Sequence, residues 1–223
     1  MNHVRSSFHF VSALTFLLTG CSDDASGSGE VAIDTWGEEY IEDGIPSAEF
    51  EDGGSATFSK FLIVIGPVTL ADVQDGEAGR IAEPAVYDLA APGPHAVGTL
   101  TGIPARTHDA FGYHVTPATG ATTVHVSASP ADADMMASMG YSIYVEGLVS
   151  HGGADKVFSW GFDAATHYAN CVDVSSGQEL PGVVVVDGNR SDAQVTIHGD
   201  HFFYDDLLST DAQLRAQHIV AAD

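Results

Sequence analysis

Apolar stretches separated by turn residues make up most of the chain from residue 55 onward. Residues 57–65 are apolar on both faces apart from Lys60, which predicts a central strand that Gly66 and Pro67 end or bend. Later stretches of short apolar sequence predict further strands. These strands are expected at residues 68–70, 85–89, 97–100, 111–115, 122–126, 141–149, 157–162, 183–186 and 194–198.

One helical segment interrupts the predicted strands. Ser129 is a favourable N-cap, Pro130 suits the first turn, Asp132 is an acid in that turn, and Gly140 stops the helix. A short C-terminal helix is expected over residues 211–218. Because the strands are short and no long amphipathic helix separates them, we predict an all-β fold: an antiparallel, immunoglobulin-like β-sandwich with one or two short helices.

The N-terminus has the pattern of a secretion signal. Residues 1–9 contain Arg5 and no acid, and residues 10–18 are mostly apolar. This apolar run is about half of the ~20 residues that a membrane-spanning helix needs. The tetrapeptide at residues 18–21 resembles the bacterial lipoprotein cleavage signal, in which the cysteine is acylated and becomes the new N-terminus. We therefore expect Cys21 to carry lipid.

The domain organisation follows from this signal. Residues 1–20 are predicted to be the signal peptide, residues 21–31 a small, polar and flexible tether, and residues 32–223 a single β-sandwich domain. Residues 31–55 remain acidic and Gly-rich, and form either a peripheral strand or a loosely ordered arm. Near the other end, the Asp-Gly-Asn sequence at residues 187–189 predicts a hairpin turn.

The chain is strongly acidic. It carries 31 Asp and Glu against 7 Lys and Arg, which gives a formal net charge of -24. Such a charge repels phosphate backbones and anionic lipid headgroups, which excludes nucleic-acid binding and electrostatic attachment to a membrane. Acyl chains on Cys21, at ~0.8 kcal/mol per buried methylene, would hold the chain to a bilayer without help from charge. By analogy with Gram-negative lipoprotein sorting, Ser22 favours the outer membrane of the bacterial cell envelope.

His167 and Cys171 are the first candidates for chemistry. If Cys21 is acylated, Cys171 has no intramolecular disulfide partner in an oxidising compartment. One interpretation makes Cys171 a buried small hydrophobic residue. The other makes Cys171 a soft metal ligand beside His167, since thiolate and imidazole together suit copper or zinc.

His198 and His201 are the second pair of candidates, at the end of the predicted strand 193–198. In a regular strand their side chains would point to opposite faces. A bend in the two residues between them would bring the imidazoles together, and neighbouring carboxylates would then serve as ligands or as partners of the ring N–H groups. The carboxylates in reach belong to Asp200, Asp205 and Asp206. The alternative is a solvated, acidic surface turn.

Other familiar chemistry is weakly represented. Polar strand faces and terminal contexts predict solvated positions for His95, His108, His114, His125 and His218. Residues 187–198 begin like a calcium loop, but the twelfth position is His198 where a bidentate Glu is required, so we interpret this segment as a turn. The sequence contains no Gly-x-Ser-x-Gly elbow, His-Glu-x-x-His helix, phosphate-binding Gly loop or dinucleotide fingerprint. We therefore expect a protein that is not an enzyme.

Several pieces of the chain resemble the MbnP-like proteins, secreted β-sandwich proteins often encoded beside methanobactin or di-haem peroxidase-type genes. Residues 58–72 are similar to the family's opening of two strands and an acid. Residues 87–89 and 100–105 are similar to its "YLVD … L.NVP.G" stretch, and residues 140–147 to its "GY.FL.LEG" stretch. The similarity spans residues 56–207. It implies a periplasmic or extracellular copper-handling protein, and in some members copper is bound by His together with an oxidised Trp.

The chain departs from this family pattern at the expected metal site. Residues 136–139 replace the family's Trp-x-Trp with Met-Ala-Ser-Met, and the two Trp present are Trp36 and Trp160. Any metal would therefore need a ligand set drawn from His167, Cys171, His198 and His201.

Two functions remain as hypotheses. The first is a membrane-anchored, non-enzymatic bacterial lipoprotein that binds a transition metal, copper before zinc. The second is a metal-free envelope protein that binds a protein partner or has a structural role. The two differ in geometry, because the first requires the candidate ligands to lie close together and the second lets them lie apart.

Overall fold

The computed structural model describes residues 27–174, 176–206 and 208–222. These residues form mostly strands with a few short helices, which confirms the predicted all-β sandwich. The predicted signal peptide and Cys21 lie outside the described residues. Within the described ranges, no helix combines the length and the apolar character that crossing a bilayer demands.

The elements follow one another closely along the chain. The helices are α1 (Glu38–Glu42), α2 (Pro130–Met139), the 3-10 helix η1 (Asp200–Phe203) and α3 (Gln217–Val220). The strands are β1 (Ser28–Trp36), β2 (Ser55–Asp72), β3 (Gly76–Ile81), β4 (Ala85–Asp88), β5 (His95–Pro104), β6 (Thr107–His108), β7 (Ala110–Val115), β8 (Thr123–Val124), β9 (Ile143–His151), β10 (Ala154–Phe162), β11 (Thr166–Tyr168), β12 (Val172–Asp173), β13 (Leu180–Pro181), β14 (Val183–Val184) and β15 (Arg190–Thr196).

Two main sheets share one core. The larger has 8 strands, with the path β10-β9-β2-β4-β8, β3 and β7 beside β2, and β11 beside β7; the smaller has 3 strands in the order β15-β1-β5. Buried side chains from both sheets, among them Val31, Leu100, Leu70 and Phe111, belong to one hydrophobic cluster. The pairs β1–β15 and β4–β8 are parallel, so the pairing departs from the fully antiparallel arrangement that we predicted.

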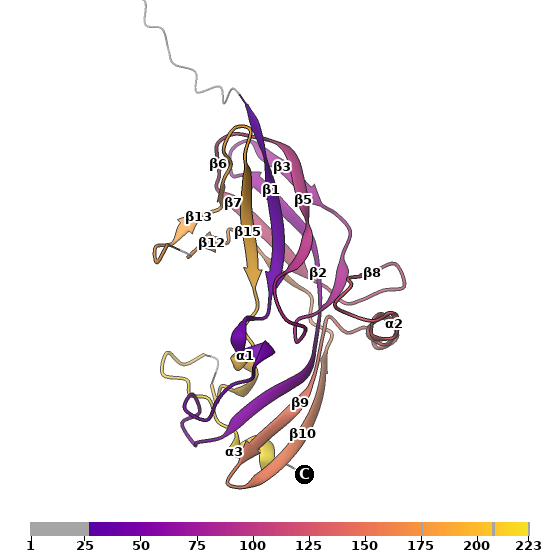
Figure 1. The fold of residues 1–223 in the computed structure, drawn as a ribbon, viewed down its shortest axis with the longest axis vertical. Coiled ribbons are helices and arrows are strands. Elements are labelled where there is room, and N and C mark those ends of the chain that lie inside the picture. Colours follow the sequence, from indigo (N-terminus) through magenta and orange to yellow (C-terminus); the bar gives the residue numbers. More distant parts are fainter. Residues whose placement is uncertain (1–26, 175, 207, 223) are drawn as a thin grey trace, which may run out of the picture.

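The 18-residue strand β2 connects the part of the elongated molecule that contains the smaller sheet with the part that contains β9 and β10 (Figure 1). The sequence predicted a strand ended or bent at Gly66 and Pro67, followed by a separate strand over residues 68–70. Both belong to one bent strand, whose first part pairs with β9 and β4 and whose second part pairs with β7 and β3. A Cβ at Gly66 (φ 128°) would lie 2.8 Å from the Cα of Pro84, so the bend requires glycine.

The boundaries of the domain differ from the prediction at its N-terminal side. β1 begins at Ser28, and Val31 is fully buried, so the last residues of the predicted tether belong to the fold. β1 is the middle strand of the smaller sheet rather than a peripheral strand or a loosely ordered arm. Apolar Val31 and Ile33 are buried, whereas acidic Glu30 is exposed and Asp34 is half-buried, so the strand directs its large apolar side chains into the core and its acids toward solvent.

Capping interactions explain where α2 begins and ends and where α3 begins. Ser129 and Asp132 form the capping box of α2, and Gly140 ends the helix in the left-handed conformation, as predicted. The C-terminal helix α3 is shorter than the predicted 211–218. It begins at Gln217 because the carboxylate of Asp52 accepts hydrogen bonds from the backbone N–H groups of Ala216 and Gln217, each at 2.8 Å.

Other predicted elements differ from the structure in their extent or in their pairing. The strand predicted over 122–126 is limited to β8, and the strand predicted over 194–198 starts and ends earlier, as β15. Residues 187–189 do form a turn between β14 and β15, but these strands are no hairpin, because β14 pairs with β6 and β15 pairs with β1. The turn chemistry is local, whereas the partner of each strand is decided by tertiary packing.

Candidate functional site

His198 and His201 lie next to each other, one on each side of the start of η1. Their ring centroids are 5.7 Å apart and the rings are nearly parallel, with an interplanar angle of 16°. His198 Nδ1 lies 3.0 Å from Oε2 of Glu38, the first residue of α1, and 52% of the His198 side chain is exposed. The chain bends between the two histidines, and it leaves them stacked at the surface beside one carboxylate.

His167 and Cys171 lie in a different part of the molecule. β11 places His167 opposite His114 of β7, and the two imidazoles stack with centroids 4.1 Å apart. The backbone N–H of Cys171 donates to the carbonyl of Phe111 at 2.9 Å. Burial raises the pKa of the half-buried Cys171 thiol above its usual value of 9.0. The protonated thiol is consequently the form of Cys171 at neutral pH.

The four predicted ligands do not form one site in the described part of the chain. Across residues 27–222, leaving aside 175 and 207, no group of three or more His, Cys, Asp or Glu is arranged to hold a metal ion. The reason is the pairing of two strands. β15 pairs with β1, which places His198 beside Glu38 of α1. β11 pairs with β7 instead, which places His167 beside His114. A single site built from His167, Cys171, His198 and His201 is therefore not assembled.

Two histidines predicted to be solvated are buried instead. His108 is 0% exposed, with Nδ1 at 3.1 Å from Oδ2 of Asp72 and Nε2 at 2.9 Å from the carbonyl oxygen of Pro104. Both ring nitrogens therefore lie within hydrogen-bond distance of an oxygen atom. His95 is 7% exposed, with Nε2 at 3.1 Å from the carbonyl oxygen of Ala91. These contacts stabilise the fold. The contact between His108 and Asp72 joins residues that lie far apart in the sequence.

His125 and Ser127 are the nearest approach to a nucleophile and a base. His125 Nδ1 lies 3.0 Å from Ser127 Oγ and 3.1 Å from the backbone N of the same residue. The Oγ atom also accepts a hydrogen bond from the N–H of Asp88 at 3.0 Å. Both contacts of Nδ1 thus close one local turn that fixes Ser127. This arrangement is typical of a side chain that stabilises a turn.

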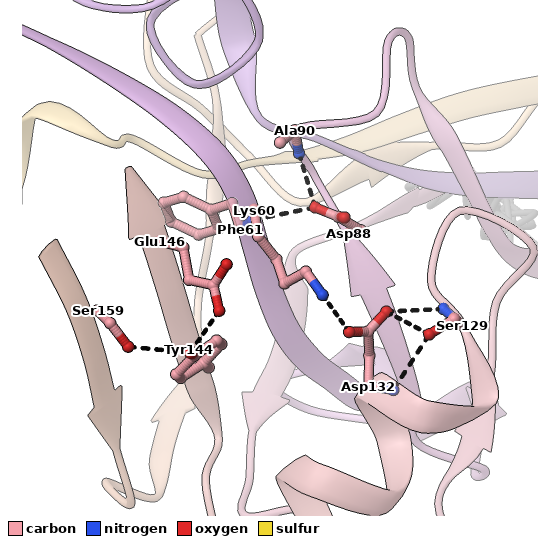
Figure 2. A network of polar contacts seen from close by, with 9 residues as sticks. All are labelled: Lys60, Phe61, Asp88, Ala90, Ser129, Asp132, Tyr144, Glu146 and Ser159. Atoms are coloured by element: carbon pink, nitrogen blue, oxygen red, sulfur yellow. Dashed lines mark hydrogen bonds and ion pairs between the residues drawn. The ribbon is translucent and has the colours of Figure 1, made fainter. Parts of the chain in front are cut away.

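A network of charged groups connects α2 to the sheet (Figure 2). The ammonium group of Lys60, on β2, contacts Oδ1 of Asp132, whose other oxygen accepts hydrogen bonds from the N–H of Ser129 at 3.0 Å and from its hydroxyl at 2.6 Å. Glu146 is the register partner of Lys60 on β9. The contact with Asp132 raises the pKa of Lys60, and the nearby carboxylates add to this effect. The network therefore positions α2 against the sheet.

A groove with a volume of about 740 Å³ lies beside the outer edge of β15. Its other walls come from β7, through Phe111 and Tyr113, and from the paired strands β12 and β13. Its size falls in the range of roughly 300–1,000 Å³ that is usual for ligand sites. Four of its apolar side chains are largely exposed to solvent: Val172, Val174, Leu180 and Val184.

The groove combines this apolar surface with negative charge. Asp34, Asp173 and Asp192 line it, whereas no Lys, Arg or His is found among the described residues of its walls. Oδ1 of Asp34 is buried and has no hydrogen-bond partner in the part of the chain that the structure describes. Such an oxygen favours a nearby donor, because a buried acceptor atom without a hydrogen bond is costly. The groove is therefore suited to a ligand with apolar and cationic groups.

Sequence reasoning did not find this groove. The groove is lined by Asp34 from β1 together with residues 191–196, which lie near the other end of the chain. The one available signal was the strand-like alternation around Asp34, in which Ile33 and Thr35 are buried. That alternation indicates a strand but not which strand lies beside it.

Comparisons with protein-family models, with curated proteins and with solved structures found no match for this chain.

Proposed function

We propose that the protein is a membrane-anchored bacterial lipoprotein whose β-sandwich is a non-enzymatic binding module of the cell envelope. The acidic, apolar groove beside β15 is the observation that carries this proposal. The groove has the volume of a ligand site, an apolar surface and negatively charged side chains, which together suit it to binding a ligand. Cys21 is the proposed site of lipidation, and the outer membrane is the proposed location.

The arrangement of the fold supports this anchoring. β1 starts at Ser28, at the end of the long axis opposite to α3 and the C-terminus (Figure 1). Ser28 follows Cys21 closely, and a fully extended connection between them reaches at most roughly 25 Å. Lipid on Cys21 would therefore hold the β1 end of the sandwich near the membrane. The groove begins at the same end, because β15 runs parallel to β1 and Arg190 lies opposite Glu30.

Metabolic labelling tests the anchor. The full chain is expressed in a Gram-negative host that is fed a palmitate analogue, and labelled protein is followed through membrane fractionation. We expect wild type and Cys171→Ser to incorporate the label and to sediment with outer membranes, and Cys21→Ser to do neither. Label in Cys21→Ser, or a soluble wild-type protein without label, would contradict the proposed anchor.

A neutral apolar dye tests the binding module. The mature lipoprotein in detergent-free nanodiscs is mixed with a water-soluble coumarin whose fluorescence rises in apolar surroundings. Val184, 57% exposed, lines the groove, whereas Val126, 92% exposed, is absent from its walls. We expect saturable dye binding that Val184→Asp weakens and Val126→Asp leaves unchanged. Equal binding by both variants would show that the groove is not the site.

Transition-metal binding, copper before zinc, is the second candidate function. The observation that favours it is the pair His198 and His201, with the Glu38 carboxylate 3.0 Å from one ring nitrogen. The resemblance to the copper-handling MbnP-like proteins points the same way and remains part of this proposal. Two imidazoles and one carboxylate suit divalent copper or zinc. This candidate requires the two rings to turn from their stacked arrangement, since ligands of one ion converge on it.

A further inference from the structure

β15 is an edge strand that faces the groove. In the described residues, β15 pairs with β1 on one side and with no strand on the other. The groove follows this second side, and each of the consecutive residues 191–196 lines it. At about 3.3 Å per residue, these residues give an edge roughly 17 Å long. An edge strand offers backbone N–H and C=O groups to any extended chain that lies beside it.

The register shows which backbone groups face the groove. The N–H of Ile197 donates to the carbonyl of Trp36 on β1 at 2.9 Å. Successive residues of a strand direct their backbone groups to opposite sides, so the residues at even positions direct theirs away from β1. These residues are Asp192, Gln194 and Thr196. They would form the hydrogen bonds to an added strand.

The two faces of this edge differ in chemistry. Asp192 and Gln194 share a face with Asp34, since Asp34 lies opposite Gln194 and Ala32 lies opposite Asp192. Val195, 4% exposed, belongs to the hydrophobic cluster that also contains Phe111 and Tyr113. An added strand would therefore meet carboxylates on one face and apolar side chains on the other. Its own side chains alternate between these faces.

We propose that the groove binds an extended peptide segment that pairs with β15 as an additional strand and alternates basic with apolar side chains. This inference rests on the proposed binding function and names its partner. Main-chain hydrogen bonds would provide affinity, and the alternating side chains would provide specificity. A basic side chain on the acidic face supplies the donor that the buried Oδ1 of Asp34 lacks.

A basic peptide fits this edge better than a second copy of the chain. The formal net charge of -24 makes two copies repel each other, and the acidic face would meet its own charge across a twofold interface. A basic segment has the charge opposite to that of Asp34 and of Asp192, although Asp192 also pairs with Arg190 at 2.9 Å. The length of the edge also exceeds what a single small cation would contact.

Fluorescence anisotropy with synthetic peptides tests the proposal. The mature lipoprotein in nanodiscs is titrated with a labelled hexapeptide of alternating Lys and Val, with a Glu and Val counterpart, and with a peptide that groups three Lys before three Val. We expect the alternating Lys and Val peptide to bind at least tenfold more tightly than either control. Equal binding of all three peptides, or dimerisation of the protein in place of peptide binding, would overturn the proposal.

Backbone pairing is tested by a matched pair of variants. Gln194→Pro removes an N–H that faces the groove, whereas Gln194→Ala keeps it, and proline is tolerated at the open edge of a sheet. We expect Gln194→Pro to lose peptide binding while Gln194→Ala retains it within about twofold. In wild type, bound peptide should also slow hydrogen exchange at the amides of Gln194 and Thr196. Unchanged binding by Gln194→Pro would exclude strand addition.

Two further readouts separate the possible failures. Cys171 lines the groove and is the one cysteine left in the described residues, so bound peptide should slow its alkylation by a maleimide. Asp34→Asn should weaken binding of the Lys and Val peptide about tenfold and binding of the Glu and Val peptide less.

If the coumarin dye binds and the peptide does not, the peptide inference fails and the binding module stands. If neither binds, both fail; if butylamine competes as well as the peptide, the ligand is a small cation and the peptide inference fails.

Discussion

Lys60 and Asp132, which lie 72 positions apart in the sequence, form an ion pair that joins the long strand β2 to the first turn of α2 (Figure 2). The two side chains are 28% and 12% exposed, so solvent screens this pair only in part. Asp132 also accepts hydrogen bonds from Ser129, the N-cap of α2. One carboxylate therefore caps the helix and attaches it to the sheet.

Replacing Asp132 should destabilise the fold measurably. Asp132→Ala removes a capping interaction and leaves Lys60 without its closest partner, and we expect the free energy of unfolding to fall by about 2 kcal/mol. Urea unfolding at neutral pH measures this change. The matched control is Asp134→Ala, an exposed position on the same helix, which should cost less than about 0.5 kcal/mol. Equal losses in the two variants would show that the ion pair contributes nothing beyond general helix effects.

Acid should destabilise the protein through its capping carboxylates. Burial raises the pKa of Asp132, but the hydrogen bonds from Lys60 and Ser129 outweigh it and hold the pKa below the usual 3.8. Burial likewise raises the pKa of Asp52, and the N–H groups of Gln217, Gly54 and Ala216 lower it below the same value. A carboxyl group with a depressed folded-state pKa stabilises the fold above its unfolded-state pKa, and this contribution disappears as pH falls through the folded-state value. We expect the free energy of unfolding, measured in urea, to fall steeply below about pH 4. The decline should be shallower in Asp132→Asn, and a parallel decline in that variant would contradict this origin.

Sequence patterns predicted the features that depend on neighbouring residues. The N-cap at Ser129, the first-turn acid Asp132 and the stop at Gly140 need only residues within one helix, and all are present. The apolar stretch around Lys60 likewise identified the strand at the centre of the larger sheet. These features follow from backbone geometry and local hydrogen bonding, which the order of residues determines directly.

Features that depend on distant partners were missed or misjudged. His108 was expected at the surface, but it is buried with one ring nitrogen beside Asp72, which lies 36 positions away. The parallel pairing of β1 with β15 joins the two ends of the domain, and it creates both the groove and the position of His198. A single sequence does not show which distant strands pair. The sequence therefore did not reveal that the four candidate metal ligands lie in two places, or that a groove forms beside β15.

The aromatic cluster around Phe58 should dominate the stability of the part of the molecule that contains β9 and β10. The ring of Phe58 has centroid distances of 5.3 Å to Phe61, 5.7 Å to Phe158 and 6.0 Å to Phe203. Phe58→Ala would leave a cavity among these rings and cost about 3–5 kcal/mol, whereas Phe58→Leu should cost less. Thermal and urea unfolding measure both. If Phe58→Ala costs under about 1 kcal/mol, the cluster is not a cooperative part of the core.

Elemental analysis tests the second candidate function at its stacked histidines. The mature lipoprotein is incubated with divalent copper or with zinc, dialysed, and assayed for metal per chain. If His198 and His201 bind a transition metal, wild type retains about one ion, with copper held more tightly than zinc. The double variant His198→Ala/His201→Ala should then lose that ion.

The other stacked pair provides a matched control for this measurement. His114 and His167 also place two imidazoles side by side, on β7 and β11, so His114→Ala/His167→Ala removes the same chemistry from a different place. We expect this variant to retain the metal. Loss of metal in the control alone would move the site to β7 and β11, and a wild-type protein that is metal-free after exposure to both ions would rule out transition-metal binding. The groove beside β15 would then be the remaining candidate, because its proposed ligand needs no metal.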